Sequence, residues 1–547
     1  MFQQSALILI AGLTFLFFFT PEHQAEYSSG IGINLLLMAI ITFIPALLSY
    51  VIGKRAIKQL PDERSQRIRL LRNSRFYAFI FSLFVLAGFI FQVYYLKLPL
   101  LIDHIFSFLK LRNLRTMIGI IPLIIALLLT RISIYELEKQ VKKTSWKRRE
   151  FLALNLKLML IPLIPFGLYL LVGDIIEQSP LSVRIFFITR PYFYWIIIIS
   201  IISIIYIKAP SLIKRIWPSQ SLPDGPLRQR IEYIAQKENI KYKDILVWNT
   251  AGGRIANAAM AGLLPYARYI FLTDHLLNNF TIDEIETVAA HEMGHIKYKH
   301  ALSYLIFSFG YLTFYIFLYI HIFPFIQRLN LGTTYIGFLG AAATLTGFYL
   351  YFVFIFRFLS RRFERQADLY AVDVTGKPDT FKSALMRLAA VNYIPRKTPR
   401  IFDVIKTHPS ILRRLEFIDK GMNELSSVVR YKKAMLHMKY TLAIIFLAVL
   451  TLFITSKESL FPPAEIHYEI GRQYAIEGMI DEAIVEFSNA IKLDPESEMA
   501  HYALGVLYAQ KGSLDQAVEE LEKALEINPG NKAIQRKLIQ VKKRSEA

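Results

Sequence analysis

Long apolar segments constrain the fold of this chain more than any other feature. Its 547 residues hold nine apolar stretches, most of them long enough to cross a bilayer as a helix, which takes about 20 residues. These stretches are residues 6–19, 31–52, 76–96, 116–135, 151–173, 192–207, 301–326, 333–359 and 440–455. The first and last are short, so each fits a tilted span or an interfacial helix. We expect a mainly α, polytopic helical membrane protein with about nine spans.

Basic residues alternate with these stretches along the chain. Residues 53–75 hold eight Lys and Arg and residues 136–150 hold six, whereas residues 21–30 hold none. This alternation is typical of the positive-inside rule, so the formal net charge of +21 indicates membrane topology and not nucleic-acid binding. The rule predicts a cytoplasmic N-terminus, cytoplasmic segments at 208–300 and 360–438, and a C-terminal tail outside. We expect an integral protein of a prokaryotic cell (inner) membrane.

The pattern divides the chain into six parts. We expect a block of six transmembrane helices, a cytoplasmic α/β segment, a transmembrane hairpin, a second cytoplasmic segment, a last span and a repeat module, at residues 1–207, 208–300, 301–359, 360–438, 439–457 and 464–547. A Pro- and Ser-rich linker is predicted at 208–226. Within the α/β segment, periodicity predicts a helix at 227–238 and strands at 245–248 and 268–273.

The motif H-E-x-x-H occupies residues 291–295, on a helix that a Thr281/Glu284 capping box opens. Positions i and i+4 share a helix face, so His291 and His295 can hold one zinc ion together. Glu292 lies beside them and is predicted to take a proton from a zinc-bound water. We expect this helix to continue into the span at 301. His300 would then point away from the ligand face, as a structural or interfacial histidine.

A catalytic zinc usually has three protein ligands, so another helix must supply one. The best candidate is Glu364, which directly follows the eighth span. Asp368 lies one turn later on the same face and is predicted to hydrogen-bond a ligating imidazole and fix its tautomer. His295 precedes the seventh span by six residues and Glu364 follows the eighth by five, so both lie roughly 8–10 Å from the membrane. A charged pair on a solvated helix face is the alternative reading of Glu364 and Asp368.

The C-terminal tail repeats itself. Residues 464–497 and 498–531 are each 34 residues long and align without gaps. Matching pairs include Gly471/Gly505, Tyr474/Tyr508, Ala483/Ala517 and Pro495/Pro529. The period and the small residues are those of tetratricopeptide repeats, with residues 532–544 as a polar capping helix. The repeats predict a protein partner. Because two repeats are near the minimum for stability, we expect the module to lean on the membrane domain or to self-associate.

With these residues in place, the chain resembles the integral-membrane zinc metalloproteases of the HtpX heat-shock protease and type I CAAX prenyl protease superfamily. The motif at 291–295 is similar to the zinc-binding helix of that superfamily, and residues 363–368 are similar to the segment in which the Glu is the third ligand. Residues 254–258 resemble its edge strand, which implies that Asn257 and Ala258 pair with the substrate backbone. Residues 407–410 and the following Arg413 and Arg414 resemble its late H-P motif, which implies an active-site His408 and Arg414.

The parts predict a zinc endopeptidase (one Zn2+ per chain) that cleaves membrane or membrane-associated proteins in quality control. Glu292 is the predicted general base, and His408 with Arg414 is predicted to stabilise the oxyanion. Substrate would bind as an added strand along Asn257 and Ala258, so side-chain selectivity should be loose. One alternative is cleavage of prenylated C-terminal peptides. Another, of a different class, is an inactive membrane scaffold that recruits partners through its repeats.

Overall fold

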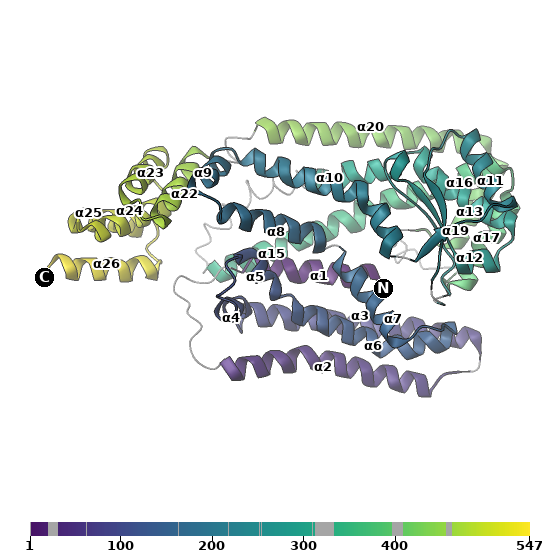
Figure 1. The fold of residues 1–547 in the computed structure, drawn as a ribbon, viewed down its shortest axis with the longest axis horizontal. Coiled ribbons are helices and arrows are strands. Elements are labelled where there is room, and N and C mark those ends of the chain that lie inside the picture. Colours follow the sequence, from purple (N-terminus) through teal and green to yellow (C-terminus); the bar gives the residue numbers. More distant parts are fainter. Residues whose placement is uncertain are drawn as a thin grey trace.

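The computed structural model describes residues 2–19, 31–61, 63–161, 163–216, 218–250, 252, 254–308, 310–311, 333–395, 408–455 and 462–546. Long helices lie side by side in a bundle, with a small sheet and its helices at one end and the C-terminal repeats at the other (Figure 1). The N-terminal block contains α1 (Phe2–Phe17), α2 (Ile31–Lys58), α3 (Arg64–Tyr94), α4 (Leu98–Ile105), α5 (Arg112–Ile118), α6 (Ile121–Lys142), α7 (Arg148–Leu160), α8 (Leu163–Glu177), α9 (Leu181–Thr189) and α10 (Pro191–Ile216).

Among the described residues, five helices are long and apolar enough to span a membrane. They coincide with the second, third, fourth, sixth and eighth predicted spans, and the bent pair α7–α8 coincides with the fifth. The first predicted span is the shorter helix α1, and the ninth forms the second half of α20 (Leu425–Thr455). Most of the predicted seventh span, 301–326, falls outside the described residues. Side chains such as Leu36 and Leu47, at 61% exposure each, cover the outside of α2 with apolar surface, as a lipid-facing helix requires.

The sheet has four strands in the order β1-β2-β4-β3. The strands are β1 (Ser219–Ser221), β2 (Asp244–Trp248), β3 (Ala258–Ala261) and β4 (Tyr269–Thr273). The two predicted strands are the parallel central pair β2 and β4, and both outer strands run antiparallel to their neighbours. The sequence predicted as a linker at 208–226 is instead the end of α10 followed by β1. Three of the four residues of β3 are alanine, which has a low strand propensity, so pairing with β4 makes this segment a strand.

In the described part of the chain, this domain also contains the helices α11 (Pro226–Lys237), α12 (Asp274–Asn279), α13 (Ile282–Lys297), α16 (Arg357–Thr375), α17 (Pro378–Val391) and α19 (Ile411–Asn423). One core of buried side chains joins the sheet to α11, α13, α16 and α17, and it includes Ile231, Ile270, Ala290, Ala371 and Phe381. The helix α16 continues α15 (Thr333–Leu350) through a π-helical stretch, Tyr351–Phe356. Glu364 is therefore part of one continuous helical segment that extends out of the bundle, as predicted.

The helix α13 starts as predicted but ends early. Thr281 Oγ1 accepts from the backbone N–H of Glu284 at 3.2 Å, and the Glu284 carboxylate accepts from the N–H of Thr281 at 3.0 Å. The helix stops at Lys297, since Lys299 adopts a left-handed conformation with φ of 53°. Lys439 of α20 donates to the free carbonyl of Tyr298 at 2.8 Å. The prediction that one helix continues past residue 300 is therefore wrong.

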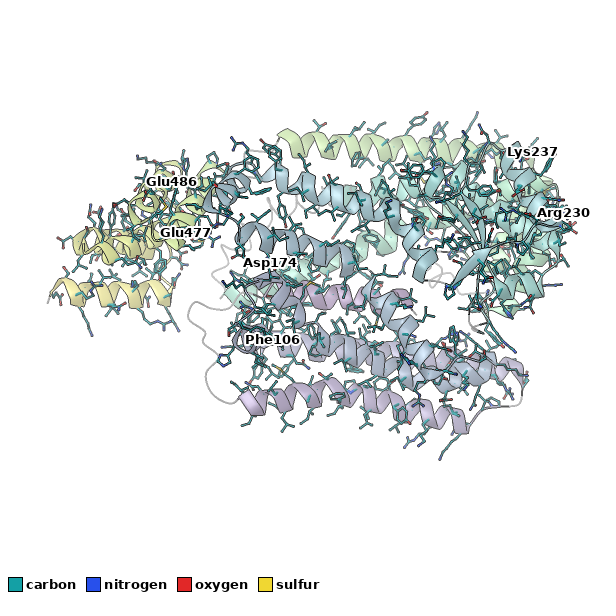
Figure 2. All side chains as sticks on the ribbon, in the orientation of Figure 1. Phe106, Asp174, Arg230, Lys237, Glu477 and Glu486 are labelled. Carbon is teal, nitrogen blue, oxygen red and sulfur yellow. The ribbon has the colours of Figure 1, made fainter. Side chains whose placement is uncertain are left out.

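The repeat module consists of α22 (Pro463–Ile476), α23 (Ile480–Leu493), α24 (Glu498–Lys511), α25 (Leu514–Ile527) and α26 (Lys532–Ser545). Its first helix packs against α9 of the membrane block, where Arg184 donates to Gln473 Oε1 at 2.7 Å and also pairs with Glu477. Glu477 lies on the side of the module that faces the bundle, far from Arg230 and Lys237 of α11 (Figure 2). The repeat module therefore contacts the membrane domain, as expected, and it does so through specific polar contacts between α9 and α22.

The repeat register explains this contact. Residues Leu507 and Lys511 stand 34 positions after Gln473 and Glu477. Leu507 packs with Phe487 of the preceding repeat, and Lys511 pairs with Asp481 of that repeat. The first repeat has no preceding repeat, and α9 occupies the position that such a repeat would fill. At the other end α26 covers the second repeat with Ile534, Leu538 and Val541. Both ends of this short repeat array are therefore covered by another helix.

Candidate metal centre

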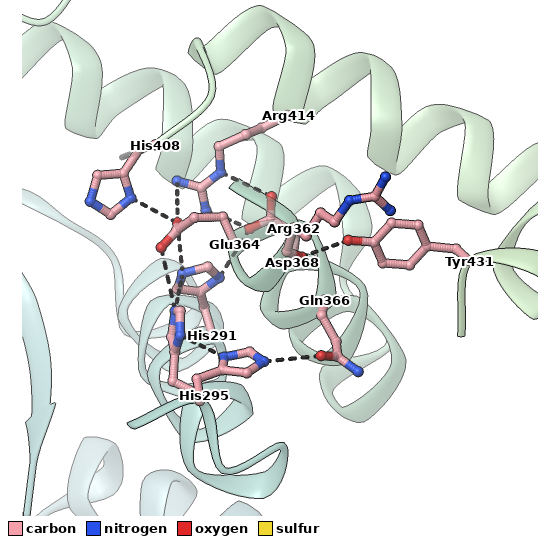
Figure 3. A network of polar contacts seen from close by, with 10 residues as sticks. His291, His295, Arg362, Glu364, Gln366, Asp368, His408, Arg414 and Tyr431 are labelled. Carbon is pink, nitrogen blue, oxygen red and sulfur yellow. Dashed lines mark hydrogen bonds and ion pairs between the residues drawn. The ribbon is translucent and has the colours of Figure 1, made fainter. Parts of the chain in front are cut away.

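Three side chains from two helices converge where α13 crosses α16. Nε2 of His291 and Nε2 of His295 lie 3.3 Å apart, and each lies 3.6 Å from a carboxylate oxygen of Glu364. The three ligand atoms are all within 4.8 Å of one another (Figure 3). Helix α13 carries the imidazoles at adjacent turns and α16 carries the carboxylate, so the crossing of the two helices builds the site.

Gly294 sets how closely the helices cross. A Cβ at this position would lie 3.0 Å from Cα of Ala367 and 3.3 Å from its Cβ. The glycine inside the motif and the alanine between Glu364 and Asp368 therefore let the two backbones meet. A larger residue at either position would push the carboxylate away from the imidazoles.

A buried carboxylate supports the first histidine. Nδ1 of His291 lies 3.0 Å from Oδ1 of Asp368, whose side chain is fully buried. The guanidinium of Arg414, on α19, donates to the other oxygen of Asp368 at 2.9 Å. Asp368 therefore lies where it was predicted, behind a candidate ligand. Arg414 pairs with Asp368, and its Nη1 lies 3.8 Å from Oε2 of Glu364.

Glu292 is half-buried between α13 and the sheet. The pKa of the Glu292 carboxyl is raised overall. Burial is the largest cause, the charge of His291 opposes it, and the nearby carboxylate of Glu364 adds to it. The backbone N–H of Met260 in β3 donates to this carboxylate. The outer edge of β3 therefore faces the site.

The edge strand itself begins at Ala258, and Asn257 precedes it. Asn257 is held by Thr273, whose hydroxyl accepts from the Asn257 N–H at 2.9 Å and whose own N–H donates to the Asn257 carbonyl at 3.0 Å. Within the described part of the chain β3 pairs with β4 alone, which leaves its other edge free. Such an edge can accept an extended peptide by strand addition.

His408 reaches the site from the segment before α19. Its Nδ1 lies 3.0 Å from Oε2 of Glu364, and its side chain is 64% exposed. Figure 3 shows His408 and Arg414 on the same side of Glu364, across from the two histidines of α13. Thr407, which belongs to the same motif, lies outside the described residues.

Sequence reasoning missed two residues at this site. His300 was expected off the ligand face, but its Nδ1 lies 2.9 Å from Nδ1 of His295. Gln366 was not considered, and its Oε1 lies 3.0 Å from Nε2 of His300. The break at Lys299 turns His300 back toward the site, and no sequence pattern predicts that break.

The pKa of His295 is lowered to about 4, first by burial and then by the charge of His291.

The donor set suits zinc. Two imidazole nitrogens and one carboxylate oxygen are the ligand set of one class of catalytic zinc sites, in which a fourth position stays open for water. The buried carboxylate of Asp368 lies 3.0 Å from Nδ1 of His291, at the position where such histidines usually have a hydrogen-bonding partner. No cysteine is present in the chain, so thiolate ligation does not compete.

Comparison with known proteins agrees with this reading. Residues 221–421 match the family model described as Peptidase family M48, and residues 471–512 and 499–531 match models described as TPR repeat and Tetratricopeptide repeat. The chain is 28% identical over 223 residues to the probable CAAX prenyl protease 1 of Schizosaccharomyces pombe, covering 39% of this chain and 46% of that protein. It is 27% identical over 197 residues to the protease HtpX homolog 2 of Methanosarcina acetivorans, covering 32% and 65%.

Among solved structures, S. mikatae Ste24p superposes with a TM-score of 0.52 at 22% identity, covering 70% of this chain and 98% of that one. This likeness concerns the fold. The chain spans less than two thirds of the length of the two curated relatives described above. The matches confirm the resemblance to the HtpX and CAAX prenyl protease superfamily, the C-terminal tetratricopeptide repeats and the mainly helical membrane fold.

Proposed function

We propose that this chain is a membrane-embedded, zinc-dependent endopeptidase that cleaves membrane or membrane-associated proteins as part of protein quality control. The observation that carries the proposal is the convergence of His291, His295 and Glu364 within 4.8 Å, beside Glu292 and a free strand edge. The match to the M48 peptidase family over residues 221–421 supports it. An inactive scaffold would not need this set of side chains to stay complete.

In the proposed mechanism, His291, His295 and Glu364 would hold a zinc ion, which would supply a Lewis acid able to lower the pKa of water toward neutrality. Glu292 accepts the proton of the attacking water and later delivers it to the leaving amine. His408, exposed and beside the site, donates to the developing oxyanion. Arg414 acts through Asp368, whose carboxylate orients the ring of His291. The peptide backbone of the substrate binds along the β3 edge from Ala258 on, because Thr273 already occupies both backbone groups of Asn257.

The proposed topology follows from charge and shape together. Basic segments predict that the end of the bundle carrying the sheet is cytoplasmic. The repeats lie at the other end of the bundle and would then face outside (Figure 1). We therefore propose cleavage at the cytoplasmic face of a prokaryotic inner membrane and protein binding by the repeats at the opposite face.

A second candidate is proteolysis of prenylated C-terminal peptides. The relatives named CAAX prenyl protease 1, including that of S. pombe, favour it. Comparing the cleavage rates of a farnesylated peptide and its unmodified twin separates the two candidates. Faster cleavage of the farnesylated peptide would support the second, and equal rates the first.

The proposal is tested with the purified full chain and the Glu292→Gln variant. The variant should hold one zinc per chain, since Glu292 is no ligand, but should lose cleavage of a test membrane protein by about 100-fold or more, as general-base catalysis contributes. Glu286→Gln, in the same helix but paired with Lys377, is the matched control and should cleave normally. Cleavage by Glu292→Gln at the wild-type rate would refute the assignment.

A further inference from the structure

His295 has a partner on the side away from the candidate metal position. Its Nε2 faces His291 and Glu364, while its Nδ1 lies 2.9 Å from Nδ1 of His300. Nε2 of His300 lies in turn 3.0 Å from Oε1 of Gln366. The three side chains form one line of polar contacts, which runs from α13 across the helix break to α16.

The donor and acceptor atoms along this line of contacts can be assigned from the chemistry of the amide and imidazole groups. The Oε1 atom of Gln366 can only accept, so Nε2 of His300 must carry a hydrogen. In a neutral imidazole the other nitrogen is then an acceptor, which makes Nδ1 of His300 the acceptor for His295. His295 must donate through Nδ1, and its Nε2 is left with a free lone pair aimed at His291 and Glu364. This is the tautomer that a metal ligand needs.

The surroundings hold the line in place. His300 is 1% exposed and stacks on Phe363 of α16 with ring centroids 4.2 Å apart and planes at 10°. Gln366 is 7% exposed and stands two residues after Glu364 on the same helix. Any movement of α16 therefore shifts a candidate ligand and the end of the line together.

We propose that His300 and Gln366 are positioning residues that fix the ring orientation and tautomer of His295 for metal binding. His291 has a carboxylate for this task, in Asp368, and His295 has this neutral relay instead. The proposal rests on the proposed role of His295 as a zinc ligand.

The test measures zinc affinity of the purified full chain by competition with a chromogenic chelator. His300→Phe keeps a ring to stack on Phe363 but removes the acceptor, and it should weaken zinc binding about 10- to 100-fold, the usual effect of losing such a partner. Gln366→Leu should weaken it similarly, whereas Gln366→Glu, which keeps an acceptor oxygen, should stay within about twofold of wild type.

A double variant separates the relay from general damage to the fold. Because both residues act through His295, His300→Phe combined with Gln366→Leu should bind zinc no more weakly than His300→Phe alone. Zinc affinity of His300→Phe or Gln366→Leu equal to that of wild type would overturn the proposal, as would losses that add up in the double variant. If wild type binds no zinc or Glu292→Gln still cleaves, the proposed function fails instead.

Discussion

The close crossing of α13 and α16 makes Gly294 the most informative position for substitution. In Gly294→Ala the new Cβ would lie 3.0 Å from Cα of Ala367 and 3.1 Å from Cδ1 of Tyr370, where ordinary contact begins at 3.4 Å. The helices must therefore separate by about 0.4 Å. Zinc sites tolerate only about 0.2 Å in their ligand distances, so the carboxylate of Glu364 would no longer reach its position.

We expect a cost both in metal binding and in folding. Overpacking costs about 1–3 kcal/mol, and the better helix propensity of alanine returns up to about 1 kcal/mol. The apo protein should thus lose at most about 3 kcal/mol, while zinc affinity should fall about tenfold or more. Chelator competition measures the affinity, and denaturant titration with zinc removed measures the folding stability.

Gly347→Ala is the matched control, since nothing lies within 4 Å of a Cβ at that helical position. It should bind zinc like wild type. If Gly294→Ala also bound zinc with wild-type affinity, the crossing of α13 and α16 would not control the site, and the reasoning would be wrong.

Three further predictions concern the supports of the site and the repeats. Asp368→Ala should lower the free energy of unfolding, measured by denaturant titration, by about 3–5 kcal/mol, since it leaves the guanidinium of Arg414 buried without its partner. The control Asp373→Ala changes a residue of the same helix that is 76% exposed, and it should be nearly neutral. Removing zinc with a chelator should lower the melting temperature, and added Zn2+ but not Mg2+ should restore it; at a 1,000-fold excess over Kd the stabilisation is about 4 kcal/mol. Arg184→Ala should free the repeats from α9, which a lower yield of crosslinking between cysteines placed at the α9–α22 contact would reveal in this cysteine-free chain; an unchanged yield would mean that Arg184 does not hold the module.

Much of the local structure could be predicted because it depends on neighbours in the chain. The capping box at Thr281, the strands β2 and β4, and the shared face of His291 and His295 all follow from periodicity or short spacing. The exact 34-residue period likewise predicted the repeat helices. The strand β3 escaped prediction from periodicity, since three of its four residues are alanine, and only the likeness of residues 254–258 to a family edge strand pointed to its start.

Local patterns along the chain establish which side chains are available for zinc chemistry and that long apolar helices must be buried in lipid, because helix periodicity and hydrophobicity act over a few residues at a time. Where those side chains meet depends on the packing of the folded chain. The contacts of Arg414 with Asp368, of His300 with His295 and of Arg184 with α22 each join residues distant in the chain or displaced by a backbone break. Such contacts depend on how rigid helices cross and end, and this geometry is set by packing of the whole molecule.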